Sequence, residues 1–244
     1  MSVDINQVAG YYDHLTTEQL ASGVNDRIYH LYRRVRRLGL KPNANILELG
    51  CGIGTLTYLL SGCVKKGRIE AVDISPASVE FARQRVRQPG VSFVAADVVE
   101  HQPAMGHIDL ITLFDILEHI PAERHRELFR NIALISGEHT KVLINIPSPA
   151  SVLYDQQHNP AALQIIDQPL PLALILDNIE KNGLSLVFFE TYSIWAENDY
   201  QFFVVEKQPA FKEVKLSTKR SFFQKALKKL ERTYVKLRYP FKKL

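Results

Sequence analysis

Between residues 45 and 147 the chain alternates short apolar runs with segments of helical periodicity. The five runs are NILELG (45–50), RIEAVDIS (68–75), VSFVAAD (91–97), IDLITLFD (108–115) and KVLINIP (141–147). One of the helical segments begins at Ser75-Pro76, a favourable N-cap followed by proline in the first turn. A regular alternation of strand and helix is typical of a sheet covered by helices on both faces. We therefore predict a doubly wound α/β fold.

This alternation ends after Pro147. Residues 148–168 form a longer polar segment, which we expect to cover the carboxyl edge of the sheet. A helix is predicted at about 171–182, because Gly183 follows it as a C-cap. Two strand-like runs, LSLVFFETYSI and YQFFVVEK, close this part of the chain and are expected to pair as an antiparallel hairpin. The predicted sheet is thus Rossmann-like, seven-stranded and mostly parallel.

The sequence suggests three parts. Residues 1–40 are predicted to be N-terminal helices that fold over the site as a lid, with Tyr11 and Tyr12 as candidate substrate contacts. Residues 41–207 form the α/β domain, and residues 208–244 form a basic tail. The net charge is +4, but the stretch from Lys207 onwards has thirteen Lys or Arg and two acids, or +11, which leaves −7 for the preceding residues. We interpret an acidic body and a basic tail as separate physical objects.

Composition excludes several classes of protein. Cys51 and Cys63 fit neither a metal-ligand pattern nor a disulfide framework. The start MSVDINQ does not resemble a signal peptide, and no apolar run approaches the ~20 residues that span a bilayer. We therefore expect a cytoplasmic protein.

The first apolar run leads into a glycine-rich loop. The segment ILELGCGIGT (46–55) places Gly50, Gly52 and Gly54 directly after a strand. Glycine permits a sharp turn and a close approach of backbone to a ligand, and doubly wound sheets bind ligands at this edge. The spacing G-x-G-x-G differs from the G-x-G-x-x-G of dinucleotide sites, and the Gly-Lys-Ser/Thr ending of a P-loop is absent. The loop therefore predicts a ligand site without a strong phosphate signature.

Two acids end the next two strands. Asp73 follows Gly50 by 23 residues, where a carboxylate accepts hydrogen bonds from ribose hydroxyls, and Asp97 ends the third strand, where it can meet an adenine edge. A nucleoside is the ligand that these positions favour.

The motifs ILELGCGIGT, AVDIS, AAD and FDILEHI, in this order, resemble those of class I S-adenosylmethionine-dependent methyltransferases. The resemblance covers roughly residues 45–147 and is of the small-molecule type, similar to ubiquinone-type O-methyltransferases. It implies S-adenosylmethionine as cofactor and S-adenosylhomocysteine as product, with Asp73 on the ribose and Asp97 and the Val98 backbone on the adenine. The implied cofactor residues are Glu48, Gly50, Cys51, Gly52, Gly54, Asp73, Ile74, Asp97, Val98 and Phe114.

Asp115, Glu118 and His119 follow the fourth strand and would share one face of a helical turn. Transfer to a hydroxyl needs a base, typically worth ~10²–10⁴ in rate, and His119 with Asp115 is the candidate catalytic pair. The stretch also resembles the acid-x-x-Glu-His segment of ubiquinone-type O-methyltransferases, where such groups bind a divalent cation in some members. Alternatively, His119 bonds only to backbone near Pro121.

The methyl acceptor is the part of the function that the sequence constrains least. We expect a hydroxyl of a small-molecule or lipid/glycan-linked acceptor, with Tyr154 and His158 of the cover segment as candidate contacts. N-methylation of a small amine, with Asp115 positioning it, and a non-catalytic cofactor-binding scaffold are the alternatives. Nucleic acid is disfavoured because an Asn/Asp-Pro-Pro-aromatic stretch is absent after the fourth strand.

The basic tail has an amphipathic helical pattern. Its apolar positions are Phe223, Ala226, Leu227, Leu230, Tyr234 and Leu237, and its cations are Lys225, Lys228, Lys229, Arg232 and Lys236. Such a helix packs on its own protein, on a second copy, or on an anionic membrane surface. Nucleic acid fits less well, because the acidic body offers no basic groove.

Overall fold

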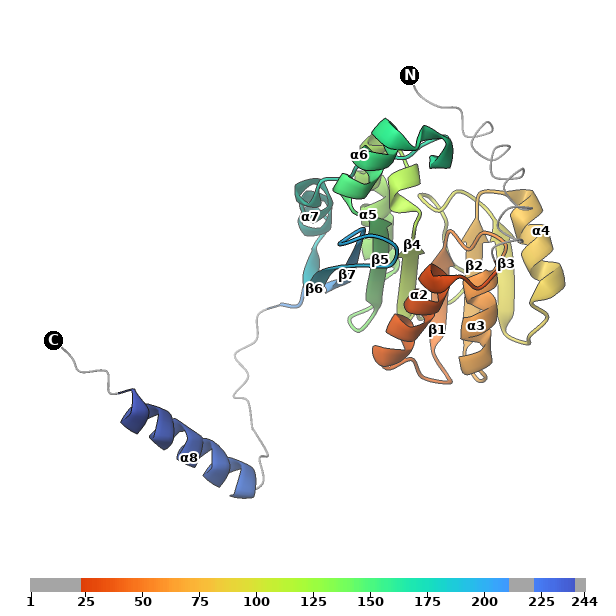
Figure 1. Ribbon diagram of the computed structural model, residues 1–244. Coiled ribbons are helices and arrows are strands. Elements are labelled where there is room, and N and C mark those ends of the chain that lie inside the picture. Colours follow the sequence, from red (N-terminus) through yellow and green to blue (C-terminus); the bar gives the residue numbers. More distant parts are fainter. Residues whose placement is uncertain (1–22, 211–221, 240–244) are drawn as a thin grey trace. The chain divides into compact units, whose positions relative to one another are not determined.

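The computed structural model describes residues 23–210 and 222–239, and the chain divides into two compact units, Met1–Pro209 and Ala210–Leu244. The first unit contains one seven-stranded sheet (Figure 1). Its strands are β1 (Asn45–Leu49), β2 (Arg68–Asp73), β3 (Val91–Ala95), β4 (Leu110–Phe114), β5 (Lys141–Pro147), β6 (Leu184–Tyr192) and β7 (Tyr200–Lys207). All seven lie where the sequence predicted strands.

The sheet order is β3-β2-β1-β4-β5-β7-β6. The strands β1 to β5 are parallel, and β7 lies antiparallel between β5 and β6. The predicted mostly parallel sheet with a C-terminal hairpin is therefore confirmed. The order reverses beside β1, so the carboxyl ends of β1 and β4 flank the switch point at which such sheets bind ligands.

Helices cover both faces of the sheet (Figure 1). The α-helices of this unit are α2 (Asp26–Arg37), α3 (Thr55–Cys63), α4 (Pro76–Arg85), α5 (His125–Ile135), α6 (Pro149–His158) and α7 (Leu172–Lys181), and the short 3₁₀ helices are η1 (Leu117–His119), η2 (Ala122–Arg124) and η3 (Pro160–Ala162). Leu31 of α2 and Leu60 of α3 are fully buried with Ile46 on one face. Phe129 of α5 and Ile179 of α7 are fully buried on the other.

Alternation of side chains along β1 produces these two cores. Ile46 belongs to the core under α2 and α3, and its neighbour Leu47 belongs to the core under α5 and α7. Successive side chains of a strand point to opposite faces, so an uninterrupted apolar run serves a sheet that is covered on both sides.

Local signals set the ends of several helices. The Ser75 side chain accepts a hydrogen bond from the Ser78 amide and caps α4, as the sequence predicted. Gly183, with φ of +70°, follows α7 in the left-handed conformation that favours glycine. The predicted cover segment 148–168 holds more regular structure than expected, because Ser148 caps α6 through the Ser151 amide and Pro149 opens the helix.

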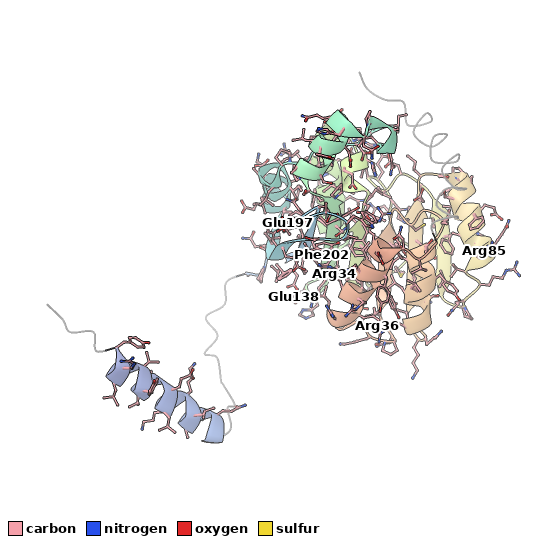
Figure 2. All side chains as sticks on the ribbon, in the orientation of Figure 1. Arg34, Arg36, Arg85, Glu138, Glu197 and Phe202 are labelled. Carbon is pink, nitrogen blue, oxygen red and sulfur yellow. The ribbon has the colours of Figure 1, made fainter. Side chains whose placement is uncertain are left out.

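Cation–π contacts of Arg34 hold helix α2 against the C-terminal hairpin of β6 and β7. The Arg34 guanidinium carbon lies 3.8 Å from the Tyr192 ring centre and 4.9 Å from that of Phe202 (Figure 2). Arg34 also forms an ion pair with Glu190 of β6. Contacts of this kind stabilise by about 0.5–2 kcal/mol, and they hold the first described helix beside the switch point. Residues 1–22, and with them most of the predicted lid, lie outside the described residues.

The second unit contains α8 (Phe222–Arg238). Leu227, Leu230, Tyr234 and Leu237 are 65–77% exposed, and basic side chains lie between them along the helix. Among the described residues, none of the helices is both long and apolar enough to cross a membrane.

Candidate active site

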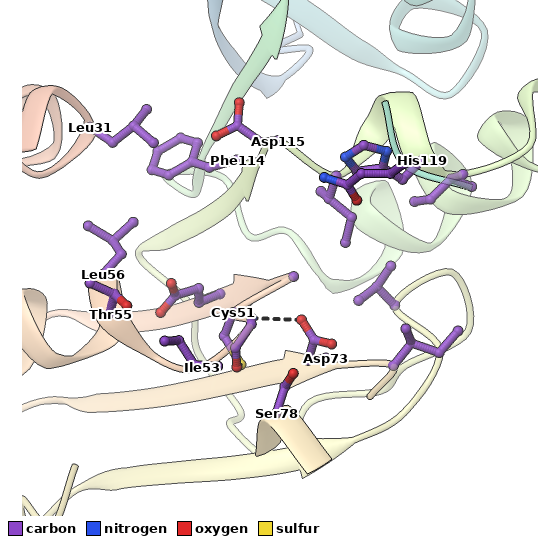
Figure 3. Close-up of a pocket in the computed structure, with 18 of the residues that line it drawn as sticks. Leu31, Cys51, Ile53, Thr55, Leu56, Asp73, Ser78, Phe114, Asp115 and His119 are labelled. Atoms are coloured by element: carbon purple, nitrogen blue, oxygen red, sulfur yellow. Dashed lines mark hydrogen bonds between the residues drawn. The ribbon is translucent and has the colours of Figure 1, made fainter. Parts of the chain in front are cut away.

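A cavity of about 250 Å³ opens at the carboxyl ends of β1, β2 and β4 (Figure 3). Its lining includes nine of the ten predicted cofactor residues: Glu48, Gly50, Cys51, Gly52, Asp73, Ile74, Asp97, Val98 and Phe114. The predicted catalytic residues Asp115 and His119 also line it. In Figure 3 Asp73 and Ser78 lie on one side of the cavity, and Phe114 and Asp115 lie on the other. The fold thus brings residues from distant parts of the sequence to one space.

The glycine loop owes its shape to positive φ angles. Gly50, Gly52 and Gly54 have φ of +82°, +51° and +78°. A Cβ at Gly50 would lie 2.5 Å from the Cδ1 of Ile116, a separation that no side chain tolerates without a shift. Gly54 serves helix packing and not the cavity. It does not line the cavity, and a Cβ there would lie 2.9 Å from the Ala82 Cβ. Gly54 therefore allows α3 to begin against α4.

Asp73 organises this loop. Its Oδ2 accepts a hydrogen bond of 2.7 Å from the Gly52 amide (Figure 3). Its Oδ1 accepts one of 3.0 Å from the Ser75 amide. Asp73 also lines the cavity, at the position from which a carboxylate accepts hydrogen bonds from ribose hydroxyls. The same side chain thus shapes the loop and faces the cavity.

Glu48 is a buried acid beneath the loop. It is 4% exposed, and its Oε2 accepts a hydrogen bond of 2.7 Å from the Thr57 hydroxyl. Burial raises the pKa of Glu48 to about 7, and the nearby Asp73 carboxylate adds to the rise, although the Thr57 hydrogen bond opposes it. Burial likewise raises the pKa of the Cys51 thiol, so Cys51 is an uncharged part of the wall.

Asp97 has a partner that the sequence did not suggest. Its Oδ2 accepts a hydrogen bond of 2.7 Å from Arg124 of η2, and its Oδ1 accepts one of 3.0 Å from the Val99 amide. Arg124 lines the cavity beside it. The carboxylate predicted to meet adenine is therefore held in place from two directions.

Asp115 takes an unusual backbone conformation at the end of β4. Its φ is +53°, in the left-handed region that a non-glycine residue occupies only where its surroundings hold it. Arg27 of α2 forms an ion pair of 3.1 Å with its Oδ2, and the Asn145 amide of β5 donates a hydrogen bond of 2.9 Å to its Oδ1. Because of this backbone turn, Asp115 does not begin a helical turn. The predicted shared helical face with Glu118 and His119 is wrong.

His119 is a buried imidazole with a defined partner. Its Nδ1 lies 2.6 Å from the Ile166 carbonyl oxygen and 3.2 Å from the Asp167 Oδ1. Only a protonated Nδ1 donates to a carbonyl, so this contact selects the tautomer with its lone pair on Nε2. Burial lowers the pKa of His119, and the Asp167 carboxylate opposes that fall. A neutral imidazole is the form that accepts a proton.

The structure does not favour Glu118 as a metal ligand in the site. It is 2% exposed, does not line the cavity, and its Oε2 has no hydrogen-bond partner among the described residues. Burial raises its pKa well above the ordinary value. Within residues 23–210 and 222–239, no three His, Cys, Asp or Glu side chains gather so as to hold a metal ion. Asp115 is paired with Arg27 and His119 with the Ile166 carbonyl, and we do not propose a cation there.

Two of the candidate substrate residues, Tyr154 and His158, do not line the cavity. Tyr154 is 61% exposed and stacks on His158 with ring centres 4.2 Å apart, on the surface of α6. Tyr11 and Tyr12 lie outside the described residues. From the cover segment, Gln164 and Ile166 line the cavity in their place.

Sequence reasoning missed several polar side chains at this site, four of which are Arg27, Arg124, Asn145 and Asp167. Asn145 had a signal, because it is the one polar side chain between Val142 and Ile146 in an otherwise apolar strand. The other three stand in polar, surface-like segments, where the sequence pattern does not separate them from solvated residues.

The strand order, the glycine loop after β1 and the acids after β2 and β3 define the class of this domain: residues 46–135 form a class I S-adenosylmethionine-dependent methyltransferase domain. The same residues match the family described as "Methyltransferase domain".

Known proteins support this assignment over part of the chain. Malonyl-[acyl-carrier protein] O-methyltransferase from Anoxybacillus flavithermus is 35% identical over 89 residues, which are 36% of this chain and 33% of the relative. Trans-aconitate 2-methyltransferase from Escherichia coli is 32% identical over 111 residues, 46% of this chain and 42% of the relative. The matches thus span about a third to two fifths of these relatives.

Solved structures extend the likeness in fold to 84% of the chain. Magnesium protoporphyrin IX methyltransferase from Synechocystis PCC 6803, with bound SAH, has a TM-score of 0.66 at 17% identity and covers 84% of this chain and 100% of its own. A putative methyltransferase from Haloferax volcanii, in complex with the Trm112 activator, has a TM-score of 0.67 at 16% identity over 84% of this chain and 99% of its own. At these identities the likeness establishes the fold.

Proposed function

We propose that this protein transfers the methyl group of S-adenosylmethionine to a hydroxyl of a small-molecule or lipid/glycan-linked acceptor. One observation carries the proposal: a single cavity joins the glycine loop and Asp73 to Asp115 and the neutral His119. A cofactor site beside a group able to accept a proton is the arrangement that transfer to a hydroxyl requires.

The residues present fit this cofactor. Gly50 and Gly52 line the cavity without side chains, which lets backbone approach a ligand, and the Gly52 amide donates a hydrogen bond to Asp73. Asp73 would hold the ribose, Asp97 and the Val98 backbone the adenine, and Glu48 and the glycine loop the methionine end. When bound, the cofactor supplies a methyl group on a positively charged sulfur. The chain's own part is to orient the acceptor and to take its proton, and orientation alone is worth up to ~7–11 kcal/mol.

The surroundings of Asp115 favour a hydroxyl over an amine. An amine acceptor would use Asp115 as its counter-charge, but Arg27 already balances this carboxylate at 3.1 Å. His119, by contrast, is held as a neutral base on the cavity wall. The relatives are named for methylation of malonyl-[acyl-carrier protein] and trans-aconitate, which supports a small or carrier-linked acceptor.

Binding of S-adenosylhomocysteine tests the cofactor part of the proposal. Calorimetry on the full chain is expected to detect binding, and Gly50→Ala is expected to weaken it at least about tenfold, because the new Cβ meets Ile116 at a φ of +82°. Gly62→Ala is the matched control, because Gly62 lies in α3 and a Cβ there meets nothing within 4 Å. A wild-type protein that binds neither product nor cofactor would contradict the proposal.

An acceptor screen tests the transfer itself. Mass spectrometry of candidate hydroxyl compounds incubated with protein and cofactor is expected to reveal a gain of one methyl group. Cofactor binding with no transfer to any hydroxyl or amine would favour the scaffold alternative.

We also propose that α8 binds an anionic membrane surface, which would bring the enzyme to a lipid-linked acceptor at the cytoplasmic face. Along the helix, exposed apolar residues such as Leu227 and Leu230 alternate with cations such as Lys228 and Arg232. Helices with this pattern bury their apolar side at the headgroup boundary, and each cation near anionic lipid contributes about 1 kcal/mol. The concentration of positive charge favours this occupant over a second copy of the same basic helix, which would repel it.

A further inference from the structure

His119 and Asp167 form a close pair that joins two segments of the site. His119 belongs to η1, directly after β4, and Asp167 lies in the segment that follows η3. The Asp167 Oδ1 is 3.2 Å from the His119 Nδ1, and the two side chains are only 12% and 10% exposed. The ring nitrogen also lies 2.6 Å from the Ile166 carbonyl oxygen. One protonated ring nitrogen therefore faces two acceptors from the same short segment.

This segment is itself fixed, so the carboxylate cannot swing away easily. The Asp167 Oδ2 accepts a hydrogen bond of 2.6 Å from the Gln164 amide, and the Asp167 carbonyl oxygen accepts one of 3.1 Å from the Gln156 side chain of α6. The Gln168 side chain donates a bond of 2.7 Å to the Ile120 carbonyl, beside η1. Bonds on both sides of Asp167 thus connect the cover segment to the turn that carries His119.

We propose that Asp167 is a positioning residue for His119: with the Ile166 carbonyl it keeps the imidazole proton on Nδ1 and the basic lone pair on Nε2, and its charge stabilises the imidazolium that forms when Nε2 takes the acceptor's proton. This inference rests on the proposed function. In the reaction the acceptor oxygen gains the methyl group while the carbon–sulfur electron pair stays on sulfur, and the acceptor's proton passes to Nε2 and then to solvent.

Several charged groups surround this imidazole. Burial lowers the pKa of His119, and the carboxylates of Asp167 and Asp115 oppose the fall, whereas Arg27 of α2 adds to it. Glu118, whose Oε1 is 3.8 Å from Nε2, is itself buried with a raised pKa. Asp167 has the largest of the charge effects that raise the pKa. Its loss should therefore make His119 a weaker base.

A purely structural role is the competing explanation, in which His119 only ties the cover segment to η1. Both roles predict that the pair matters for folding. They differ in the protonation of the ring, because a structural tie through the Ile166 carbonyl does not need the charge of Asp167. The titration of His119 therefore separates them.

The experiment is nitrogen-15 NMR of the histidine rings in the full chain, with the His119 signal assigned by its loss in His119→Gln. In the wild type we expect the tautomer protonated on Nδ1. Asp167→Asn, which retains an oxygen for the Gln164 amide, is expected to lower the pKa of His119 by about one unit or more. Asp177→Asn, at a surface pair with Lys181 on α7, is the matched control and should leave it unchanged.

The outcomes are distinguishable from failure of the proposed function, because the titration needs no acceptor. An unchanged His119 pKa in a folded Asp167→Asn protein, or a wild-type ring protonated on Nε2, would overturn the inference even if S-adenosylhomocysteine binds. If Asp167→Asn does not fold, the same titration in Asp167→Ser decides, and an unchanged His119 pKa there would overturn the inference. Once an acceptor is in hand, kcat should fall at least about tenfold in Asp167→Asn with KM little changed, as part of the ~10²–10⁴ that a general base contributes.

Discussion

Glu48 is a carboxyl group whose burial makes the stability of the domain depend on pH. Its pKa is about 7 in the folded protein against an ordinary value of 4.5. A carboxyl group with a raised folded pKa binds more protons when folded than when unfolded. Its contribution is therefore fully present below about 4.5 and is lost as pH rises through about 7, by about 3 kcal/mol for a shift of this size.

We predict that Glu48→Gln removes this dependence. The amide keeps an oxygen for the Thr57 hydroxyl but carries no charge, so the variant should lose less stability than the wild type between pH 5 and pH 8. Urea unfolding of both proteins at the two pH values measures the difference. Equal losses in the two proteins would mean that Glu48 does not titrate in this range.

At the scale of elements, the ion pair between Arg27 and Asp115 joins α2 to the end of β4. The Asn145 side chain of β5 donates a hydrogen bond to the same carboxylate. Asn145 also accepts a hydrogen bond of 2.7 Å from the Tyr192 hydroxyl of β6, so four elements meet around one carboxylate. This clamp holds Asp115 in its left-handed conformation at the cavity wall. The strain of such a residue is of the order of 1–3 kcal/mol and needs surroundings that fix it.

We predict that Arg27→Met destabilises the fold by about 2 kcal/mol, because it leaves a carboxylate with 10% exposure without its cation. The Arg27 side chain is 30% exposed, which keeps the loss below that of a fully buried pair. The double variant Arg27→Met/Asp115→Asn removes both charges and should recover at least half of the loss. Thermal and urea unfolding of the single and double variants complete the cycle, and additive losses would show that the two side chains do not interact.

At the scale of the whole molecule, charge is divided between the acidic body and the basic tail. The tail carries +11 from Lys207 onwards against −7 for the preceding residues. A segment of this charge is drawn to anionic surfaces over about a Debye length, roughly 10 Å at 0.1 M salt. The tail would then determine whether the enzyme lies at a membrane surface, while the cavity determines its cofactor and acceptor.

We predict that the full chain sediments with anionic vesicles at low salt but not with neutral vesicles, and that added salt weakens the binding. Leu227→Asp/Leu230→Asp should abolish it, because both side chains lie on the exposed apolar side of α8. Leu134→Asp, at a 74% exposed leucine of α5, is the matched control. Binding that survives the double variant, or a loss of self-association in place of vesicle binding, would contradict the membrane proposal.

The sequence by itself determined the seven strands, the glycine loop and the acids at the ends of β2 and β3. These features follow from local rules: apolar runs make buried strands, glycine permits positive φ at Gly50, and parallel strands bring their carboxyl ends to one edge. Nine of the ten predicted cofactor residues line the cavity for this reason, and the tenth, Gly54, faces Ala82 of α4 and Phe93 of β3 instead.

Only the tertiary structure decided which polar groups meet. Arg27 and Asp115 are 88 positions apart, and His119 and Asp167 are 48 apart, and in neither case does the spacing along the chain reveal the contact. The left-handed turn at Asp115 also broke the helical face that the sequence predicted for Asp115, Glu118 and His119. The pairing of buried charges depends on which distant elements pack together, because that packing determines which opposite charge lies within a few ångströms. A local sequence pattern does not contain this information.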